Sequence, residues 1–124
     1  MIAGLRTVIY HVDDLARAKA WYAAVLEREP YFDEPFYVGF NVGGFELGLD
    51  PDMDGVTLGS GGVNAYWGVP NADAELARLV ALGATVRAPV RDVGDGIRHA
   101  IVADPFGNLF GIIENPHFKP EDVR

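Results

Sequence analysis

The order of the secondary-structure elements is set first by residues 5–26, which read LRTVIYHVDDLARAKAWYAAVL. Residues 5–12 are rich in β-branched and aromatic side chains, which is typical of a strand. Asp13 and Asp14 follow, and an aspartate at this place can cap the N-terminus of a helix. From Leu15 onwards apolar residues recur every three or four positions, which predicts an amphipathic helix. The stretch therefore predicts a strand that leads directly into a helix.

Short extended segments follow this helix, at residues 31–32, 36–42 and 45–49. Asp33-Glu34-Pro35 is expected to separate the first two. Gly43-Gly44 predicts a tight hairpin, because such a turn needs positive φ at both central residues. Residues 51–62 hold many Gly, Asp and Pro residues with little apolar periodicity, so they are predicted to form a linker.

The same order of elements repeats in the second half of the chain. Residues 63–69 predict a strand, Pro70 and Asn71 mark the start of a helix, and Gly83 marks its end. Strands are expected at 85–90, 97–102 and 109–113, with a turn at 104–108. The chain thus reads as two βαβββ units, and two such small units should pair to bury enough apolar surface.

We therefore expect a single α+β domain over residues 1–124. Its first module covers about residues 4–50, its second about 63–115, and a tail follows at 116–124. The 51–62 linker permits the modules to pair within one chain or to swap between two chains.

The composition excludes several function classes. The chain has 124 residues and no cysteine, which rules out disulfides, cysteine zinc sites and a thiol nucleophile. Its net charge of −8 argues against a nucleic-acid partner, because an acidic surface repels phosphates. No apolar run approaches the roughly 20 residues that span a bilayer, and no basic-then-apolar leader opens the sequence. We expect a cytoplasmic protein without a membrane partner.

Three stretches carry a family resemblance. Val12-Asp13-Asp14-Leu15 leads to residues 21–26, residues 77–84 read ARLVALGA, and Asp104-Pro105-Phe106-Gly107-Asn108 precedes the last predicted strand. Together they resemble the vicinal oxygen chelate superfamily, which includes glyoxalase I, extradiol dioxygenases, methylmalonyl-CoA epimerase and the bleomycin resistance proteins. The resemblance covers roughly residues 4–115. It implies that two βαβββ modules pair into curved mixed sheets around a cavity, and it names no reaction.

Metal-dependent members of this superfamily place ligands on the first and last strands of each module. The resemblance puts these positions at Thr7, Glu46, Asn64 and Gly111. Only Glu46 is a strong ligand, and a carboxylate with a Thr and an Asn makes a poor transition-metal site. We therefore expect no metal and no other cofactor. The alternative is a divalent ion held by His11, Glu46 and His99, which supply a two-His-one-carboxylate ligand set.

The resemblance also indicates which side chains face the cavity. If Thr7 and Asn64 face it, strand alternation adds Ile9, His11, Tyr66 and Gly68, whereas Trp67 packs against a helix. Phe36, Tyr37 and Phe40 should divide between the two faces of their strand. The expected ligand-binding residues are Thr7, Ile9, His11, Tyr37, Glu46, Asn64, Tyr66, His99 and Gly111.

Glu46 is the candidate catalytic base, although two other interpretations stay open. It could instead hold a cationic ligand or form a salt bridge with Arg98 in a neighbouring strand. His11 is either a site residue or a hydrogen-bonded histidine at a strand end. Ser60 lies in the glycine-rich linker without a partner for a serine triad.

Two functions from different classes follow. The first is a metal-free homodimer that binds a small molecule and sequesters a cationic or aromatic compound, similar to the bleomycin-resistance branch. The second is a lyase, epimerase or dioxygenase of the same superfamily that uses Glu46, a divalent metal ion or both. The depleted ligand set and the charge of −8 favour the first.

Overall fold

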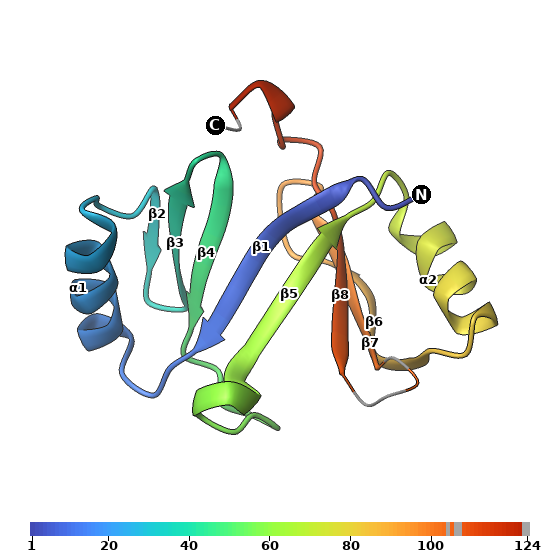
Figure 1. The fold of residues 1–124 in the computed structure, drawn as a ribbon, viewed down its shortest axis with the longest axis horizontal. Helices are drawn as coiled ribbons and strands as arrows, with labels where there is room; N and C mark the ends of the chain where they lie inside the picture. Colours follow the sequence, from blue (N-terminus) through green and yellow to red (C-terminus); the bar gives the residue numbers. More distant parts are fainter. Residues whose placement is uncertain (104, 106–107, 123–124) are drawn as a thin grey trace. The chain divides into compact units, whose positions relative to one another are not determined.

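The computed structural model describes residues 1–103, 105 and 108–122. Its elements are β1 (Gly4–His11), α1 (Leu15–Leu26), β2 (Phe32–Glu34), β3 (Tyr37–Val42), β4 (Phe45–Asp50), β5 (Val63–Gly68), α2 (Ala72–Ala81), β6 (Thr85–Asp92), β7 (Arg98–Ala103) and β8 (Leu109–Glu114), with short 3-10 turns at Gly59–Gly62 and Pro120–Asp122. This order confirms the two βαβββ repeats (Figure 1). Most of the turn predicted at 104–108 lies outside the described residues.

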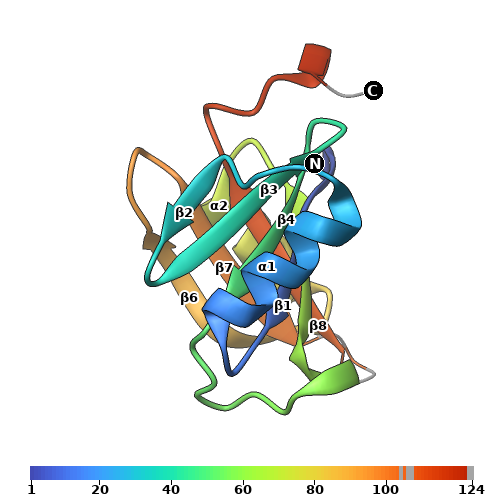
Figure 2. The same ribbon diagram turned by 90° about the vertical axis from the view of Figure 1, so that its left-hand side faces the viewer.

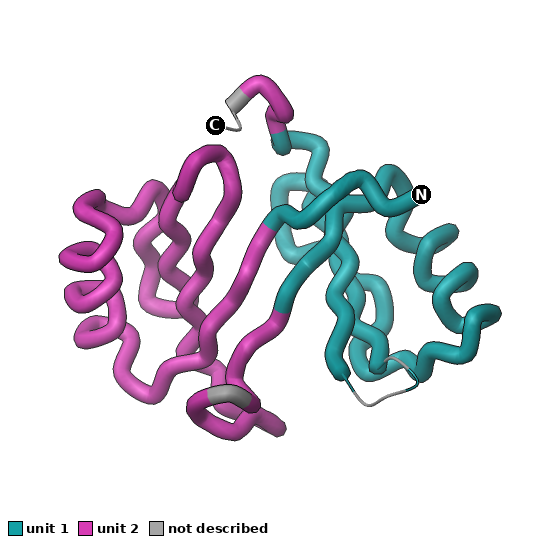
Figure 3. Tube along the Cα trace, in the orientation of Figure 1, with its two compact units in different colours: residues 1–6, 65–118 teal, residues 7–64, 119–124 magenta. Residues whose placement is uncertain are grey.

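Two compact units divide the chain (Figure 3). Unit 1 comprises residues 1–6 and 65–118, and unit 2 comprises residues 7–64 and 119–124. The boundaries between the units therefore lie within β1, within β5 and between Phe118 and Lys119. The single domain over residues 1–124 stays a prediction of the sequence.

In unit 2 the strands follow the order β2-β3-β4-β1, and β1 runs parallel to β4. α1 packs across β3 and β4 (Figure 2). The core consists of Val38, Phe40 and Leu49, against which α1 places Leu15 and Tyr22. Burial of these apolar side chains is what holds the helix on the sheet.

Both local signals predicted at the ends of these elements are present. The Asp14 side chain accepts a hydrogen bond from the Arg17 backbone N–H at 3.0 Å, which caps α1. Gly43 and Gly44 have φ values of 63° and 95°, so the β3–β4 hairpin uses the positive φ that only glycine adopts without strain.

In unit 1 the strands follow the order β5-β8-β7-β6, and β5 runs parallel to β8. Asn71 caps α2 by accepting a hydrogen bond from the Ala74 backbone N–H at 3.0 Å. Ile112 is fully buried among α2 residues, and Trp67 lies opposite it in the register. Trp67 also stacks on Phe110, with ring centroids 5.8 Å apart. Trp67 therefore faces the helix, as predicted.

Two strands differ from the sequence prediction by more than one residue at an end. β2 runs through Asp33 and Glu34, where a break was expected, because this segment pairs with β3 from Phe32↔Gly39 to Glu34↔Tyr37. β6 extends to Asp92, beyond the predicted end at residue 90. Its pairing with β7 shifts register between Val86 and Arg91, and a bulge of this kind lets an edge strand continue past a proline.

Neither α1 nor α2 is long and apolar enough to cross a membrane, and no other helix in the described part of the chain is.

Candidate functional site

Strand alternation gives the sheet of unit 2 two faces. Val38, Phe40 and Leu49 point towards α1, so the residues at alternate positions point away from it. The pairing register places Thr7 opposite Glu46, Ile9 opposite Gly48 and His11 opposite Asp50. We call this surface the helix-free face of unit 2. It carries Thr7, Ile9, His11, Phe32, Glu34, Tyr37, Gly39, Asn41, Glu46, Gly48 and Asp50.

Two tyrosine hydroxyls hold the Glu46 carboxylate on this face. The Tyr37 hydroxyl donates to Glu46 Oε1 at 2.5 Å, and the Tyr31 hydroxyl donates to Glu46 Oε2. Tyr31 precedes β2 and its side chain is 63% exposed, whereas Tyr37 and Glu46 are half-buried. Hydrogen bonds to a charged acceptor are about twice as strong as neutral ones. Glu46 is therefore an oriented carboxylate and not a loose surface charge.

A pair of glycines makes room for this cluster. Gly39 and Gly48 are cross-strand partners, and both are buried. A Cβ on Gly48 would lie 1.8 Å from the Tyr37 hydroxyl, and a Cβ on Gly39 would lie 2.8 Å from Glu46 Oε2. The sequence analysis missed both glycines and Tyr31. The available signal was a glycine in the interior of each of two adjacent strands, which often marks a close approach of another group.

The hydroxyl of Tyr37 remains a donor over the ordinary pH range. Burial, reinforced by the nearby Glu46 carboxylate, raises the pKa of Tyr37 well above its usual value. Each carboxylate oxygen of Glu46 takes one tyrosine hydroxyl and has a further lone pair. The cluster can therefore accept N–H donors from a ligand while its own geometry is maintained.

His11 is a hydrogen-bonded side chain at the end of β1. Its Nδ1 lies 2.8 Å from the Asp52 carbonyl oxygen, and its Nε2 lies 3.3 Å from Asn64 Nδ2. These partners fit a neutral ring that donates from Nδ1 and accepts at Nε2. Four strand residues, about 13 Å, separate His11 from the position opposite Glu46. The structure does not bring His11 and Glu46 together as ligands of one ion.

In unit 1, Tyr66, His99 and Gly111 share the sheet face that points away from α2. Gly111 lies opposite Tyr66, and a Cβ on Gly111 would lie 2.6 Å from the Tyr66 ring. Tyr66 therefore fills the space of the side chain that Gly111 lacks. The His99 ring centroid lies 5.6 Å from that of Tyr66, and burial, with Arg91 nearby, lowers the pKa of His99.

The four positions that the resemblance assigns to metal ligands do not fit a transition-metal ion. Glu46 is bonded to two tyrosines, Asn64 contacts His11, Thr7 offers only a hydroxyl, and the Tyr66 ring covers Gly111. Within residues 1–103, 105 and 108–122, no three His, Cys, Asp or Glu side chains are grouped so that they could hold a metal ion.

The predicted alternative for Glu46 pairs it with Arg98, but Arg98 has its carboxylate partners within unit 1. Arg98 Nη1 donates to Asp73 Oδ2 at 2.7 Å and lies 4.0 Å from Glu114 Oε1. Arg98 thus links β7 to α2 and β8. The reason is strand parity, because Arg98 points to the α2 side while its neighbour His99 points to the other.

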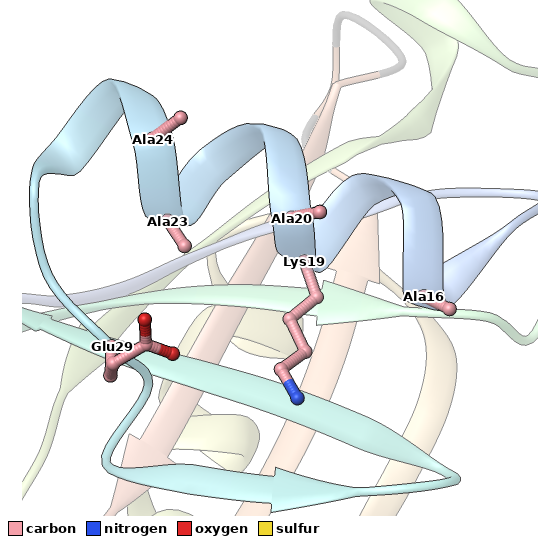
Figure 4. A pocket seen from close by; sticks show the side chains of 6 residues that line it. All are labelled: Ala16, Lys19, Ala20, Ala23, Ala24 and Glu29. Atoms are coloured by element: carbon pink, nitrogen blue, oxygen red, sulfur yellow. The ribbon is translucent and has the colours of Figure 1, made fainter.

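A hollow lies beside α1 in unit 2, away from the Glu46 cluster (Figure 4). Its lining consists of Ala16, Lys19, Ala20, Ala23, Ala24 and Glu29. Lys19 pairs with Asp33, and none of the predicted site residues lines this hollow. It gathers no aromatic ring and no cluster of polar groups, so the Tyr31–Glu46–Tyr37 cluster is the stronger candidate.

Comparisons with known proteins agree with this architecture. Residues 7–113 match the family described as glyoxalase-like domain. Uncharacterised proteins of Mycobacterium bovis and Mycobacterium tuberculosis are each 33% identical to this chain over 116 residues. Each match covers 82% of this chain, and it covers 76% of the M. bovis protein and 68% of the M. tuberculosis protein.

Solved structures show the same fold. Streptomyces coelicolor methylmalonyl-CoA epimerase, in complex with 2-nitronate-propionyl-CoA, superposes with a TM-score of 0.77 at 16% identity, covering 94% of this chain and 99% of that one. A glyoxalase/bleomycin resistance protein/dioxygenase superfamily member from Vibrio splendidus superposes with a TM-score of 0.66 at 21% identity. The match covers 90% of this chain and 99% of that one. With the match over residues 7–113, the chain belongs to the glyoxalase-like domain family of the vicinal oxygen chelate superfamily.

Proposed function

We propose that this protein binds a small organic cation on the helix-free face of unit 2, with Glu46 as the anionic anchor. The observation that carries the proposal is the carboxylate held by Tyr31 and Tyr37. Its negative charge is oriented and lies beside two aromatic rings. A cation is attracted both by such a carboxylate and by the faces of the rings.

The surroundings of Glu46 favour a cation that also has an aromatic part. The helix-free face of unit 2 carries Glu34 and Asp50 besides Glu46, and its paired strand positions hold no Lys or Arg. Phe32 extends the aromatic surface, with its ring centroid 6.1 Å from that of Tyr37 and 6.0 Å from that of Phe36. Phe36 is 66% exposed, so this surface is available to a ligand.

We infer further that the site works without the metal ion of the superfamily. The side chains at the four expected ligand positions support this inference. Above all, Gly111 has no side chain, and the Tyr66 ring fills the space that a metal-binding side chain would occupy there. After dialysis against mixed divalent ions, elemental mass spectrometry should find far less than one transition-metal ion per chain. About one tightly held ion per chain would contradict the inference.

We also propose that the protein forms a homodimer, because this is the commonest closed assembly. Light scattering tests the oligomeric state directly.

The binding proposal is tested by calorimetric titration with benzamidinium and its neutral analogue benzamide. Wild-type protein should bind benzamidinium and not benzamide. Replacing Glu46 by Gln should weaken benzamidinium binding by about ten- to a hundred-fold, because one charge-assisted hydrogen bond contributes about 1.5–3 kcal/mol. The control Glu29→Gln removes an equal charge beside α1 and should leave the affinity unchanged. Equal affinities for both probes, or equal losses in both variants, would contradict the proposal.

The second candidate function is an enzyme in which Glu46 acts as a general base. The fold shared with methylmalonyl-CoA epimerase supports this candidate as a possibility of the superfamily. A screen of lyase, epimerase and dioxygenase substrates tests it. If Glu46→Gln and His11→Ala leave any detected turnover unchanged, Glu46 is not its catalytic base.

A further inference from the structure

The sheet face of unit 1 that points away from α2 has the opposite charge character to the Glu46 face. Its paired positions are Tyr66, Gly68, Thr85, Ala88, Arg91, His99, Ile101, Ala103, Leu109, Gly111 and Ile113. The Arg6 side chain lies on the same face, because its Nε is 2.6 Å from the point where a Cβ on Gly68 would stand. The face therefore carries two arginines, Arg6 and Arg91, and its paired positions hold no Asp or Glu. In a chain with a net charge of −8, such a face is not what composition predicts.

Arg6 is held in place by one aromatic ring and two backbone carbonyl groups. Its Cζ lies over the Phe118 ring, 3.6 Å from the ring centroid, in a cation–π contact. Nη1 and Nη2 donate to the carbonyl oxygens of Leu5 and Ala3 over long distances of 3.3 and 3.4 Å. Across the described residues, no Asp or Glu oxygen lies within ion-pair distance of Arg6.

The hydrogen-bonding capacity of Arg6 is therefore only partly used. A guanidinium has five N–H donors, and the two backbone contacts occupy two of them. Burial lowers the pKa of Arg6, so its charge has lost part of its hydration. A partly dehydrated, unneutralised charge is stabilised by an anion more strongly than one that water already surrounds.

We propose that Arg6 anchors an anion-binding site on this face of unit 1, and that the bound group is an oxyanion, either a carboxylate or a phosphate. The planar fork of an arginine matches two oxygens of such a group. Arg91 adds a second positive charge to the face. His99 and Gly68 both pair with Ile113, so His99 stands two strand spacings, about 10 Å, from the strand position beneath Arg6.

This site involves a different unit and the opposite ligand charge, so it does not rest on the cation site proposed above. A molecule of metabolite size can reach from Arg6 to His99. We therefore expect a ligand whose oxyanion contacts Arg6 while a hydrogen-bonding group contacts the imidazole of His99.

The test is an NMR titration of the Arg6 Nε–H resonance with sodium phosphate and, separately, with sodium acetate at constant ionic strength. The resonance should shift and saturate with at least one anion. Tighter binding of phosphate would assign the ligand class to phosphates, and tighter binding of acetate to carboxylates. Absence of saturation with both anions would overturn the proposal.

Three variants show whether the site is specific. Arg6→Gln removes the guanidinium and should weaken binding at least tenfold, as read from the remaining amide resonances. Gly68→Ala keeps the charge but displaces the flexible guanidinium, so it should weaken binding by a similar factor. The control Arg17→Gln removes an equal charge from α1 and should leave binding within twofold. An equal loss of anion affinity in Arg17→Gln and Arg6→Gln would show that only the net charge of the protein matters, and would refute the site.

Discussion

Removing the Tyr37 hydroxyl should destabilise the protein by an amount that can be derived from the geometry of the cluster. In Tyr37→Phe, Glu46 Oε1 loses a hydrogen bond of 2.5 Å while the ring still fits over Gly48. A hydrogen bond to a charged group contributes about 1.5–3 kcal/mol. Because Glu46 is only half-buried and water can take part of the lost contact, we expect the lower end, about 1.5 kcal/mol. For a chain of this size that lowers Tm by about 5 °C.

The assay is urea unfolding at neutral pH, with a double-mutant cycle of Tyr37→Phe and Glu46→Ala to isolate the pairwise term. Tyr31→Phe is the matched control. This substitution removes a hydroxyl that donates to the same carboxylate. Because Tyr31 is 63% exposed, the loss of its hydroxyl should destabilise the protein less than the loss of the Tyr37 hydroxyl. A loss below about 0.3 kcal/mol in Tyr37→Phe, with no coupling to Glu46, would refute the reasoning because it lies within ordinary surface effects.

Three further outcomes are expected. His99 has a lowered pKa in the folded protein, so below about pH 6.5 the unfolded chain binds more protons than the folded one. In urea titrations the free energy of unfolding should therefore fall as the pH drops below about 6.5. His99→Gln should make this fall smaller. Gly111→Glu should destabilise by about 1–3 kcal/mol in thermal melts, because its Cβ would meet the Tyr66 ring, and the variant should acquire no tight metal site. Asp14→Ala and Asn71→Ala should each cost about 1 kcal/mol through loss of a helix cap, and no change in either melt would contradict the cap geometry.

Local signals in the sequence predict the order of the secondary-structure elements. The helix caps at Asp14 and Asn71 and the Gly43–Gly44 turn depend on residues close together in the chain, and each is present. The β2 strand was misplaced because its pairing with β3 outweighs the weak strand preference of Asp33-Glu34-Pro35. Tertiary pairing of this kind is not visible in one sequence.

The candidate site was less accessible to prediction. Glu46 could be identified because its position follows from the family resemblance. Its partners could not, since Tyr31 lies before β2 and reaches the carboxylate only through the β2–β3 pairing. The partner of Arg98 was missed for a similar reason, because its guanidinium is bonded to Asp73 of α2. Which polar groups meet depends on side-chain direction, and the sequence pattern fixes only strand parity.

Binding of a ligand cation at Glu46 can be observed through the ¹³C resonance of its side-chain carboxyl carbon during titration with benzamidinium. Glu46→Gln assigns this resonance by its loss. We expect the Glu46 signal to shift and saturate ahead of every other carboxylate, and benzamide to leave it in place. A Glu46 signal that stays constant while benzamidinium binds elsewhere, or does not bind, would show that Glu46 is not the anchor of a cation site.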